Sequence, residues 1–294
     1  MTAVLFRRRR LGLGSCQGIV AGSERDITIR THNPLRRTYR REGPWPNDTS
    51  LVIRWGCTAA IPVDCNRVLN TAEAIHFVNN KSAFRMLLDE HGLCPSTFTD
   101  YHSTMESGIQ HILVRPNHHA QGRRMYVVDM QDGGGDLALS AAFRRAGAGA
   151  YASEIVDKSA EYRVFVAQGR CVWVARKTPG NPQDIAWNVA RGGRFDNVRF
   201  GDWPLRVVRV AIEAFNLSGL DFGGVDVIVD QEGRAYVIEI NSAPSQTSPY
   251  RQSCVAQVFD YIIQHGKAPI PLKEERGGWK KFIHPALSTA AEVP

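Results

Sequence analysis

The sequence predicts an α+β protein in which a small α/β module precedes two larger lobes. Three observations lead to this prediction. Strand-like runs surround one helical run before residue 70, helical and strand-like runs alternate up to residue 152, and hairpin patterns dominate beyond it. We therefore expect domains at residues 1–69, 70–152 and 153–266, with a loosely attached tail over 267–294. The 294 residues, 43% of them hydrophobic, suffice for cores of this size.

The N-terminal module is predicted from three short runs. Val4–Phe6, Asp26–Thr31 and Leu51–Trp55 are apolar or alternating, which is typical of strands, and Ser15–Ala21 predicts a helix after the first of them. Residues 32–50 are rich in Arg, Pro, Asn and Gly and predict a long loop. Together these elements predict a βαβ-like module.

Two helices are predicted at the start of the next domain. They cover Asn70–Phe77 and Lys81–His91, and Gly92 ends the second. We expect Asn70 to be the N-cap of the first helix, because Glu73 stands at the capping-box position.

A polar loop separates two further strands, Ile112–Arg115 and Met125–Asp129. The loop, residues 116–124, is basic and contains Gln121 and Gly122, so its backbone N–H groups suit a flap over phosphates. Its histidines, His118 and His119, are more typical of loop polar groups than of magnesium ligands.

The remaining elements complete the two lobes. A glycine-rich turn at 132–136 precedes an Ala-rich helix over 138–149, three strands follow, and two helices flank the last hairpin. Residues 177–203 are too long for an idle connection. The expected strands are Tyr151–Val156, Tyr162–Ala167 and Cys171–Arg176, and the expected helices are Leu205–Phe215 and Val255–His265.

The last hairpin carries the strongest chemical signal. Its apolar strands, Val225–Val229 and Ala235–Ile240, contain Asp226 and Glu239, and Asn241 follows. Symmetric pairing about the turn brings the two carboxylates together with Asn241 on the same face. Carboxylates in apolar strands need a partner, and three oxygen donors suit Mg²⁺ shared with a nucleotide phosphate. A charged surface hairpin is the alternative.

Charge and cysteine content narrow the other classes. The first fifty residues hold ten arginines against four acidic residues, so most of the net charge of +7 lies there. This Arg-rich segment, with residues 7–10 and 36–41, could contact nucleic acid or an acidic partner, although no aromatic residues alternate with its arginines to stack bases. Six dispersed cysteines without a CxxC pair, and no eighteen-residue apolar run, predict a cytoplasmic protein without a membrane segment.

Several motifs stand in a fixed order before the hairpin. Lys81 opens NNKSAFRMLLDEHGLCPSTF, Glu154 and Glu161 are seven residues apart in SEIVDKSAEYRVFV, and Asn188 precedes Arg191 in an N-x-x-RGG loop. With the hairpin last, they resemble the ATP-grasp superfamily of carboxylate–amine ligases, most closely its branch of ribosomal-protein glutamate ligases. The resemblance covers about residues 70–265.

The resemblance implies an ATP-grasp fold with a divergent N-terminal subdomain, and it implies a role for each matching residue. ATP would contact Lys81, Arg115, the flap residues Gln121 and Gly122, Glu154, the backbone of Val156 and Asp157, and Glu161. Catalytic contacts to the phosphates or the substrate would come from Arg163, Lys177, Asn188 and Arg191. Two Mg²⁺ ions, which Mn²⁺ is expected to replace, would bind Asp226, Glu239 and Asn241.

Two positions depart from the family pattern. Arg115 stands where the family has a second lysine, which keeps the charge and changes the geometry, and the flap has few glycines. Structural alternatives also remain: Lys81 as a surface lysine, and Glu161 as the partner of a cation in its strand.

The implied function is an ATP-dependent ligase that forms an amide through an acyl phosphate and releases ADP and phosphate. Its substrates would be a carboxylate and an amine on an amino acid, a peptide or a protein terminus. An ATP-grasp kinase and a non-enzymatic binding protein that uses the Arg-rich segment are the alternatives.

Overall fold

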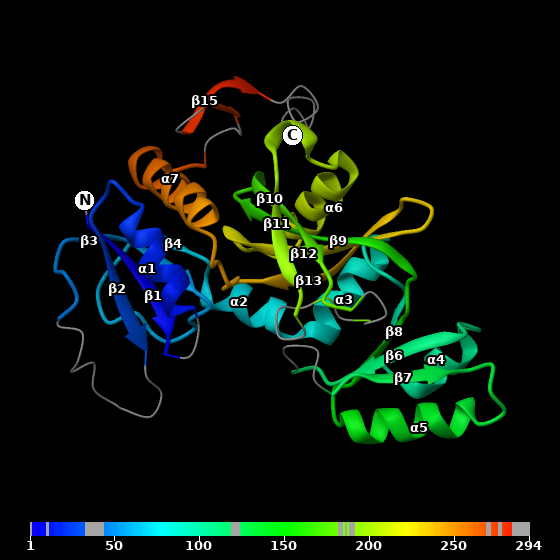
Figure 1. Ribbon diagram of the computed structural model, residues 1–294. Helices are drawn as coiled ribbons and strands as arrows, with labels where there is room; N and C mark the ends of the chain where they lie inside the picture. The colour runs from blue at the N-terminus through cyan, green and yellow to red at the C-terminus, as the bar shows by residue number, and fades with distance from the viewer. Residues whose placement is uncertain are drawn as a thin grey trace.

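The computed structural model describes residues 2–9, 12–32, 44–118, 124–181, 185, 187, 192–268, 272–275 and 278–283. Figure 1 shows an N-terminal module, a large sheet and a smaller sheet with its own helices. Among the described residues, no helix is long and apolar enough to cross a membrane.

The N-terminal module is a parallel sheet with strand order β2-β1-β3-β4. The helix α1 connects β1 to β2, as the predicted βαβ pattern requires. The short β4 extends the sheet by one strand that the sequence pattern did not predict. The elements are β1 (Thr2–Arg8), α1 (Leu13–Ala21), β2 (Ile27–His32), β3 (Thr49–Trp55) and β4 (Val68–Leu69).

The predicted N-cap of α2 (Ala72–Asn79) is wrong by one residue. The cap is Thr71, whose hydroxyl accepts a hydrogen bond from the Ala74 N–H. Asn70 is instead fully buried at φ 62°, and its side-chain oxygen accepts bonds from the N–H groups of Asp221 and Phe222. Asparagine tolerates this left-handed backbone, and its amide satisfies two N–H groups of a distant segment.

Helices α2 and α3 (Lys81–Glu90) pack against the large sheet, although we assigned residues 70–152 to one lobe. The apolar side chains of Ile75, Val78, Phe84 and Leu88 belong to the same buried cluster as the strands β9, β12 and β13. The nucleotide-binding candidate Lys81 is therefore held against the large sheet.

The smaller sheet is antiparallel with strand order β5-β8-β6-β7. The helix α5 begins at Gly135, three residues before the predicted start, because the glycine turn closes with a bond from the Gly135 N–H to the Asp132 carbonyl. The elements are β5 (Thr97–Phe98), α4 (Tyr101–Glu106), β6 (His111–Arg115), β7 (Tyr126–Asp129), α5 (Gly135–Ala146) and β8 (Tyr151–Glu154).

The large sheet is antiparallel with strand order β11-β10-β9-β12-β13, and a helix covers each face (Figure 1). The helix α6 packs on one face, while α7 fills the other face together with the N-terminal module. Its elements are β9 (Lys158–Ala167), β10 (Arg170–Thr178), β11 (Arg194–Val198), α6 (Leu205–Asn216), β12 (Phe222–Asp230), β13 (Ala235–Asn241) and α7 (Pro249–His265).

Two further elements complete the described chain. A short 3-10 helix, η2, covers Phe200–Asp202 between β11 and α6. In the tail, β14 (Leu272–Glu275) pairs antiparallel with β15 (Gly278–Ile283).

Candidate functional site

A cleft of about 1080 Å³ lies where α3, the smaller sheet and the large sheet meet. Its lining includes Lys81 from α3, Arg115 from β6, Glu154 from β8, and Asp226 and Glu239 from the hairpin. Residues that lie up to 158 positions apart in the sequence thus share one cavity.

The hairpin has the register that the turn signal predicts. Asp226 pairs with Glu239 and Gly224 pairs with Asn241, and the three predicted metal ligands all line the cleft. Gly224 is required here because a Cβ would lie 2.8 Å from the Pro244 side chain.

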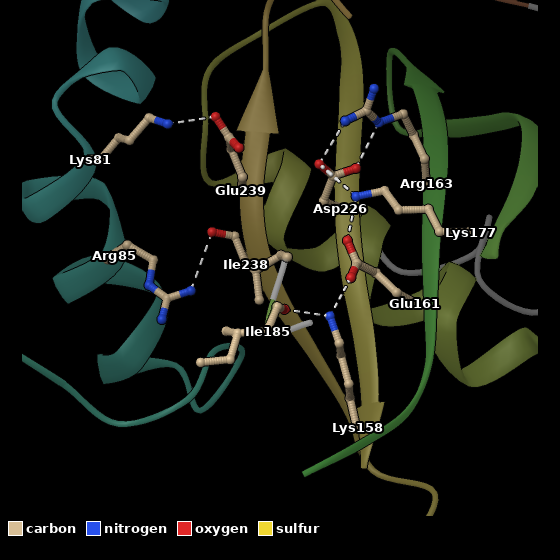
Figure 2. Close-up of polar contacts among 10 residues, drawn as sticks. All are labelled: Lys81, Arg85, Lys158, Glu161, Arg163, Lys177, Ile185, Asp226, Ile238 and Glu239. Carbon is tan, nitrogen blue, oxygen red and sulfur yellow. Dashed lines mark hydrogen bonds and ion pairs between the residues drawn. The ribbon is translucent and has the colours of Figure 1, made fainter. Parts of the chain in front are cut away.

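Asp226 is a buried carboxylate that two cations neutralise (Figure 2). Arg163 donates to both of its oxygens at 2.6 and 2.7 Å, and the Lys177 ammonium lies 3.4 Å away. Burial alone raises the pKa of Asp226, but the charges and hydrogen bonds of Arg163 and Lys177 outweigh it and lower the pKa from 3.8 to about 2. Asp226 is therefore ionised at neutral pH.

Glu161 is the second buried acid of this cluster, at 2% exposure. The ammonium of Lys158 lies 2.7 Å from one oxygen, and Lys177 donates to the other. Lys177 thus connects Glu161 with Asp226 (Figure 2). These contacts are the cation pairing considered as the alternative for Glu161, here through lysines.

Lys81 reaches across the cleft to Glu239 at 2.6 Å (Figure 2). It stands at the first position of α3, and Asn80 caps the helix by accepting from the Ala83 N–H. Lys81 is therefore no simple surface lysine, because 16% of its side chain is exposed and it pairs with a predicted metal ligand.

Two buried arginines lie in the cleft without an acidic partner in the described part of the chain. Arg115 donates to the Ser153 hydroxyl at 2.7 Å and stacks on Tyr151, while its Nε has no acceptor. Arg85 donates to the carbonyls of Val237 and Ile238, while its Nε and Nη2 have none. Burial, above all, and the charge of Arg85 lower the pKa of Arg115.

The predicted adenine segment lies at the cleft. Glu154, Val156 and Asp157 line it where β8 leads into β9. The backbone there is fixed, because the Ile155 N–H donates to the His111 carbonyl at 2.9 Å. Four other predicted site residues lie outside the described residues, namely Gln121, Gly122, Asn188 and Arg191.

The sequence interpretation missed three cleft cations, Arg85, Lys158 and Arg251. A usable signal existed for Arg85, which stands four residues after Lys81 and so on the same face of the helix. Lys158 stands three residues before Glu161, but its strand pattern gave no indication of the pairing. Arg251 belongs to the first turn of α7 and had no motif.

The donor set suits Mg²⁺ when a ligand completes the coordination. No group of three His, Cys, Asp or Glu side chains able to hold a metal occurs in the described ranges. Two carboxylates and one amide oxygen line the cleft, and Mg²⁺ typically combines one or two carboxylates with phosphate oxygens and water. The site therefore fits a magnesium ion shared with a phosphate.

The Arg-rich segment is only partly described, and one of its members is not a free side chain. Arg7 is 4% exposed, and its guanidinium donates to the Thr31 hydroxyl and to the carbonyls of Arg8 and Arg9. Residues 10 and 36–41 lie outside the described residues.

Comparison with known proteins identifies the family. A family model of the ATP-grasp domain, family 3 of its clade, matches residues 91–260, more than half of the chain. A curated relative, "Probable alpha-L-glutamate ligase 2" of Hahella chejuensis, is 29% identical over 107 residues. This match covers 35% of the chain and 34% of the relative, about a third of its length.

Solved structures share the fold over nearly the whole chain. The ATP-grasp ligase PsnB with minimal precursor, Mg and ADP has a TM-score of 0.61 and 15% identity, covering 90% of this chain and 97% of PsnB. A Chryseobacterium gregarium RiPP-associated ATP-grasp ligase, in complex with ADP and a leader and core peptide, has 0.62 and 13%, covering 92% and 98%. D-alanine–D-alanine ligase from Bacillus anthracis with ATP has 0.60 and 13%, covering 90% and 94%.

Proposed function

The chain belongs to the ATP-grasp superfamily, and from this premise we propose that it is an ATP-dependent ligase that joins a carboxylate to an amine. The observation that carries the proposal is the single cleft into which the family's motifs converge. The segment after Glu154, the cations Lys81 and Arg115, and the hairpin acids line one cavity.

ATP would be held between the two sheets. The segment from Glu154 to Asp157 supplies backbone groups for the base, and Glu161 lies next to it for the ribose. Lys81, Arg85 and Arg115 line the same cleft and supply charge for the phosphates. Positioning and electrostatic stabilisation account for most of the catalysis in phosphoryl transfer, so fixed cations of this kind suffice without a nucleophilic side chain.

Mg²⁺ would be held by Asp226, Glu239 and Asn241. When bound, it would neutralise charge on the phosphate oxygens. The cations that pair with these acids in the present structure would then become available to anions. Arg163 would turn from Asp226 to a phosphate or to the substrate carboxylate, and Lys81 from Glu239 to a phosphate.

The chemistry would proceed in two steps. The substrate carboxylate attacks the γ-phosphorus of ATP, which forms an acyl phosphate and releases ADP. The amine then attacks the acyl carbon, phosphate leaves, and the amine proton passes to solvent or to phosphate. Arg163 and Lys177 lie where the developing negative charge would be stabilised, because both reach the carboxylate of Asp226.

Peptides and amino acids are the substrate class that we propose. Related structures named as ligases contain precursor peptides, and the curated relative is named a glutamate ligase. An amino acid, a peptide or a protein terminus would each offer the carboxylate or the amine.

The test combines a binding and a turnover measurement. The protein is titrated with ATP and Mg²⁺ by calorimetry, then incubated with a panel of amino acids and peptides while ADP, phosphate and product mass are followed. We expect an ATP-dependent amide with one ADP per bond, and a hydroxamate when hydroxylamine traps the acyl phosphate. Absence of ATP binding together with absence of stimulated ADP release would overturn the proposal. A stable phosphorylated product without an amide would indicate the kinase alternative.

A further inference from the structure

One buried cation of the cleft has no role in the proposed chemistry. Arg251, in the first turn of α7, lines the cleft and is 6% exposed. Its guanidinium carbon lies 5.4 Å from the ring centroid of Trp173 and 5.4 Å from that of Phe195. Two aromatic rings thus hold a planar cation in the wall of the cavity.

The guanidinium of Arg251 has no polar partner within the described ranges. None of the hydrogen bonds or ion pairs of these residues involves it, and its Nε is a buried donor without an acceptor. Burial, and then the charge of Arg163, lower the pKa of Arg251, and only the charge of Asp196 opposes them. Asp196 itself accepts hydrogen bonds from Thr178 and Arg194.

A neighbouring pair of cations shows what is missing. The ring of Phe195 also contacts Arg163 at 4.9 Å and Lys177 at 5.5 Å. Those two cations are neutralised by Asp226 and Glu161, whereas Arg251, on the same ring, is not. A buried cation without an anion is costly, so a site of this kind is completed by an anionic ligand.

We propose that Arg251, held between Phe195 and Trp173, is a specificity-determining residue that binds a carboxylate of the substrate other than the one that reacts. This rests on the proposed function for the identity of the ligand as substrate. A guanidinium presents parallel N–H donors that match the two oxygens of a carboxylate. The ATP phosphates would have their own cations in Lys81, Arg85 and Arg115, which belong to α3 and β6.

The position of Arg251 also sets the substrate class. Its ring partner Phe195 contacts Arg163 and Lys177, the residues expected at the reacting groups. The bound carboxylate would therefore lie within one side chain's length of the reaction centre. A dicarboxylate, or an amino acid or chain end with a free carboxylate next to the reacting group, meets this requirement, whereas a neutral amide does not.

The experiment compares an acid with its neutral isostere. Glutarate and glutaramide have nearly the same shape and differ in charge, and each is titrated into the full chain by calorimetry, with and without ADP and Mg²⁺. We expect the protein to bind glutarate at least about tenfold more tightly than glutaramide, the range of a charge-assisted, bidentate contact. Equal affinities for the two probes would overturn the proposal.

Three variants locate the preference. Arg251→Gln should abolish the preference for glutarate and leave the ADP affinity unchanged, and Arg251→Lys should retain part of the preference. Arg209→Gln, which removes a charge from the exposed face of α6, is the control and should keep it. A preference that persists in Arg251→Gln, or a parallel loss of ADP affinity, would contradict the proposal.

The measurements separate this proposal from the proposed function. The ADP titration tests nucleotide binding, and the acid-to-amide ratio without ADP tests Arg251 independently. A protein that binds no nucleotide but loses its acid preference in Arg251→Gln would disprove the ligase and retain the carboxylate subsite. Melting temperatures of both Arg251 variants identify a loss of folding, which would lower all affinities together.

Discussion

Two walls of the same cleft balance their buried cations in opposite ways. On the large sheet, Arg163 and Lys177 are matched by Asp226 and Glu161. On α3 and β6, Arg85 and Arg115 have no acidic partner among the described residues, and burial and the neighbouring Arg85 lower the pKa of Arg115. The first wall is stable without a ligand, whereas the second is completed by an anion.

This difference separates two kinds of ligand site. A matched ion pair must exchange partners when a metal or a phosphate binds, so removing one partner leaves a buried charge and destabilises the protein. An unmatched cation gains a partner on binding, so its removal weakens the ligand complex and spares the empty protein. The predictions below test this distinction from the largest expected effect to the smallest.

Asp226→Asn should have the largest effect. It removes a proposed magnesium ligand and leaves Arg163 and Lys177 without a full negative charge. We expect ATP-dependent product formation to fall about 10²–10³-fold, and the free energy of unfolding to fall by about 3 kcal/mol. Steady-state kinetics and urea unfolding measure the two effects.

The control for this variant is on the same strand. Asp230 is also buried and pairs with an arginine, Arg234, at the hairpin turn outside the cleft. Asp230→Asn should lower the stability and leave the rate per folded molecule unchanged. If both variants lose activity equally, the loss reflects the hairpin rather than the proposed metal ligand.

Arg115→Gln tests the unmatched wall. Glutamine can keep the hydrogen bond to Ser153 while the charge is lost, so we expect the ATP affinity to fall about 10- to 100-fold. The nucleotide-free protein should be no less stable than the wild type, because an unpaired buried charge has been removed. Calorimetric titration and thermal unfolding measure both, and a destabilisation as large as that of Asp226→Asn would refute the comparison.

The sequence predicted those parts of the site that local signals determine. The turn between the hairpin strands sets the register, so Asp226 opposite Glu239 followed from the pattern alone. The family and the ATP-grasp fold were predicted from motif order and are confirmed. Both conclusions depend on residues that are close in sequence or in a fixed order.

Contacts between distant segments were not predictable in the same way. Asn70 was assigned as a cap because its neighbours fit a capping box, but its side chain bonds to Asp221 and Phe222 across 151 and 152 positions. Arg251 is a cleft residue only because β10 and β11 bring Trp173 and Phe195 to it. No local pattern encodes such packing, so the unmatched arginines became visible only in the structure.

The pH dependence of stability tests the matched wall at a smaller magnitude. The pKa of Asp226 is lowered from 3.8 to about 2 on folding, so its contribution is fully present above pH 4 and is lost as the pH falls toward 2. We expect about 2 kcal/mol of the stability difference between the wild type and Asp226→Asn to vanish over that range. Urea unfolding at pH 5, 4, 3 and 2 measures it, and a difference that grows on acidification would contradict the sign.

Arg85→Met gives the smallest of these effects and separates a positional role from a charge role. Arg85 holds α3 to β13 through the carbonyls of Val237 and Ile238, and its Nε and Nη2 remain free for a ligand. If these donors reach a phosphate, the affinity for ATP should fall about tenfold more than the affinity for adenosine, which has no phosphate.

Arg85→Lys is the matched control because it keeps the charge and can still bond to one carbonyl. It should retain most of the preference for ATP over adenosine, whereas Arg85→Met should lose it. If Arg85 serves only to position α3, both nucleotides should weaken equally in Arg85→Met, since Lys81 on the same helix would be displaced for both. That result would leave Arg115 as the unmatched arginine that acts on the phosphates, and would confine the anion-completed wall to β6.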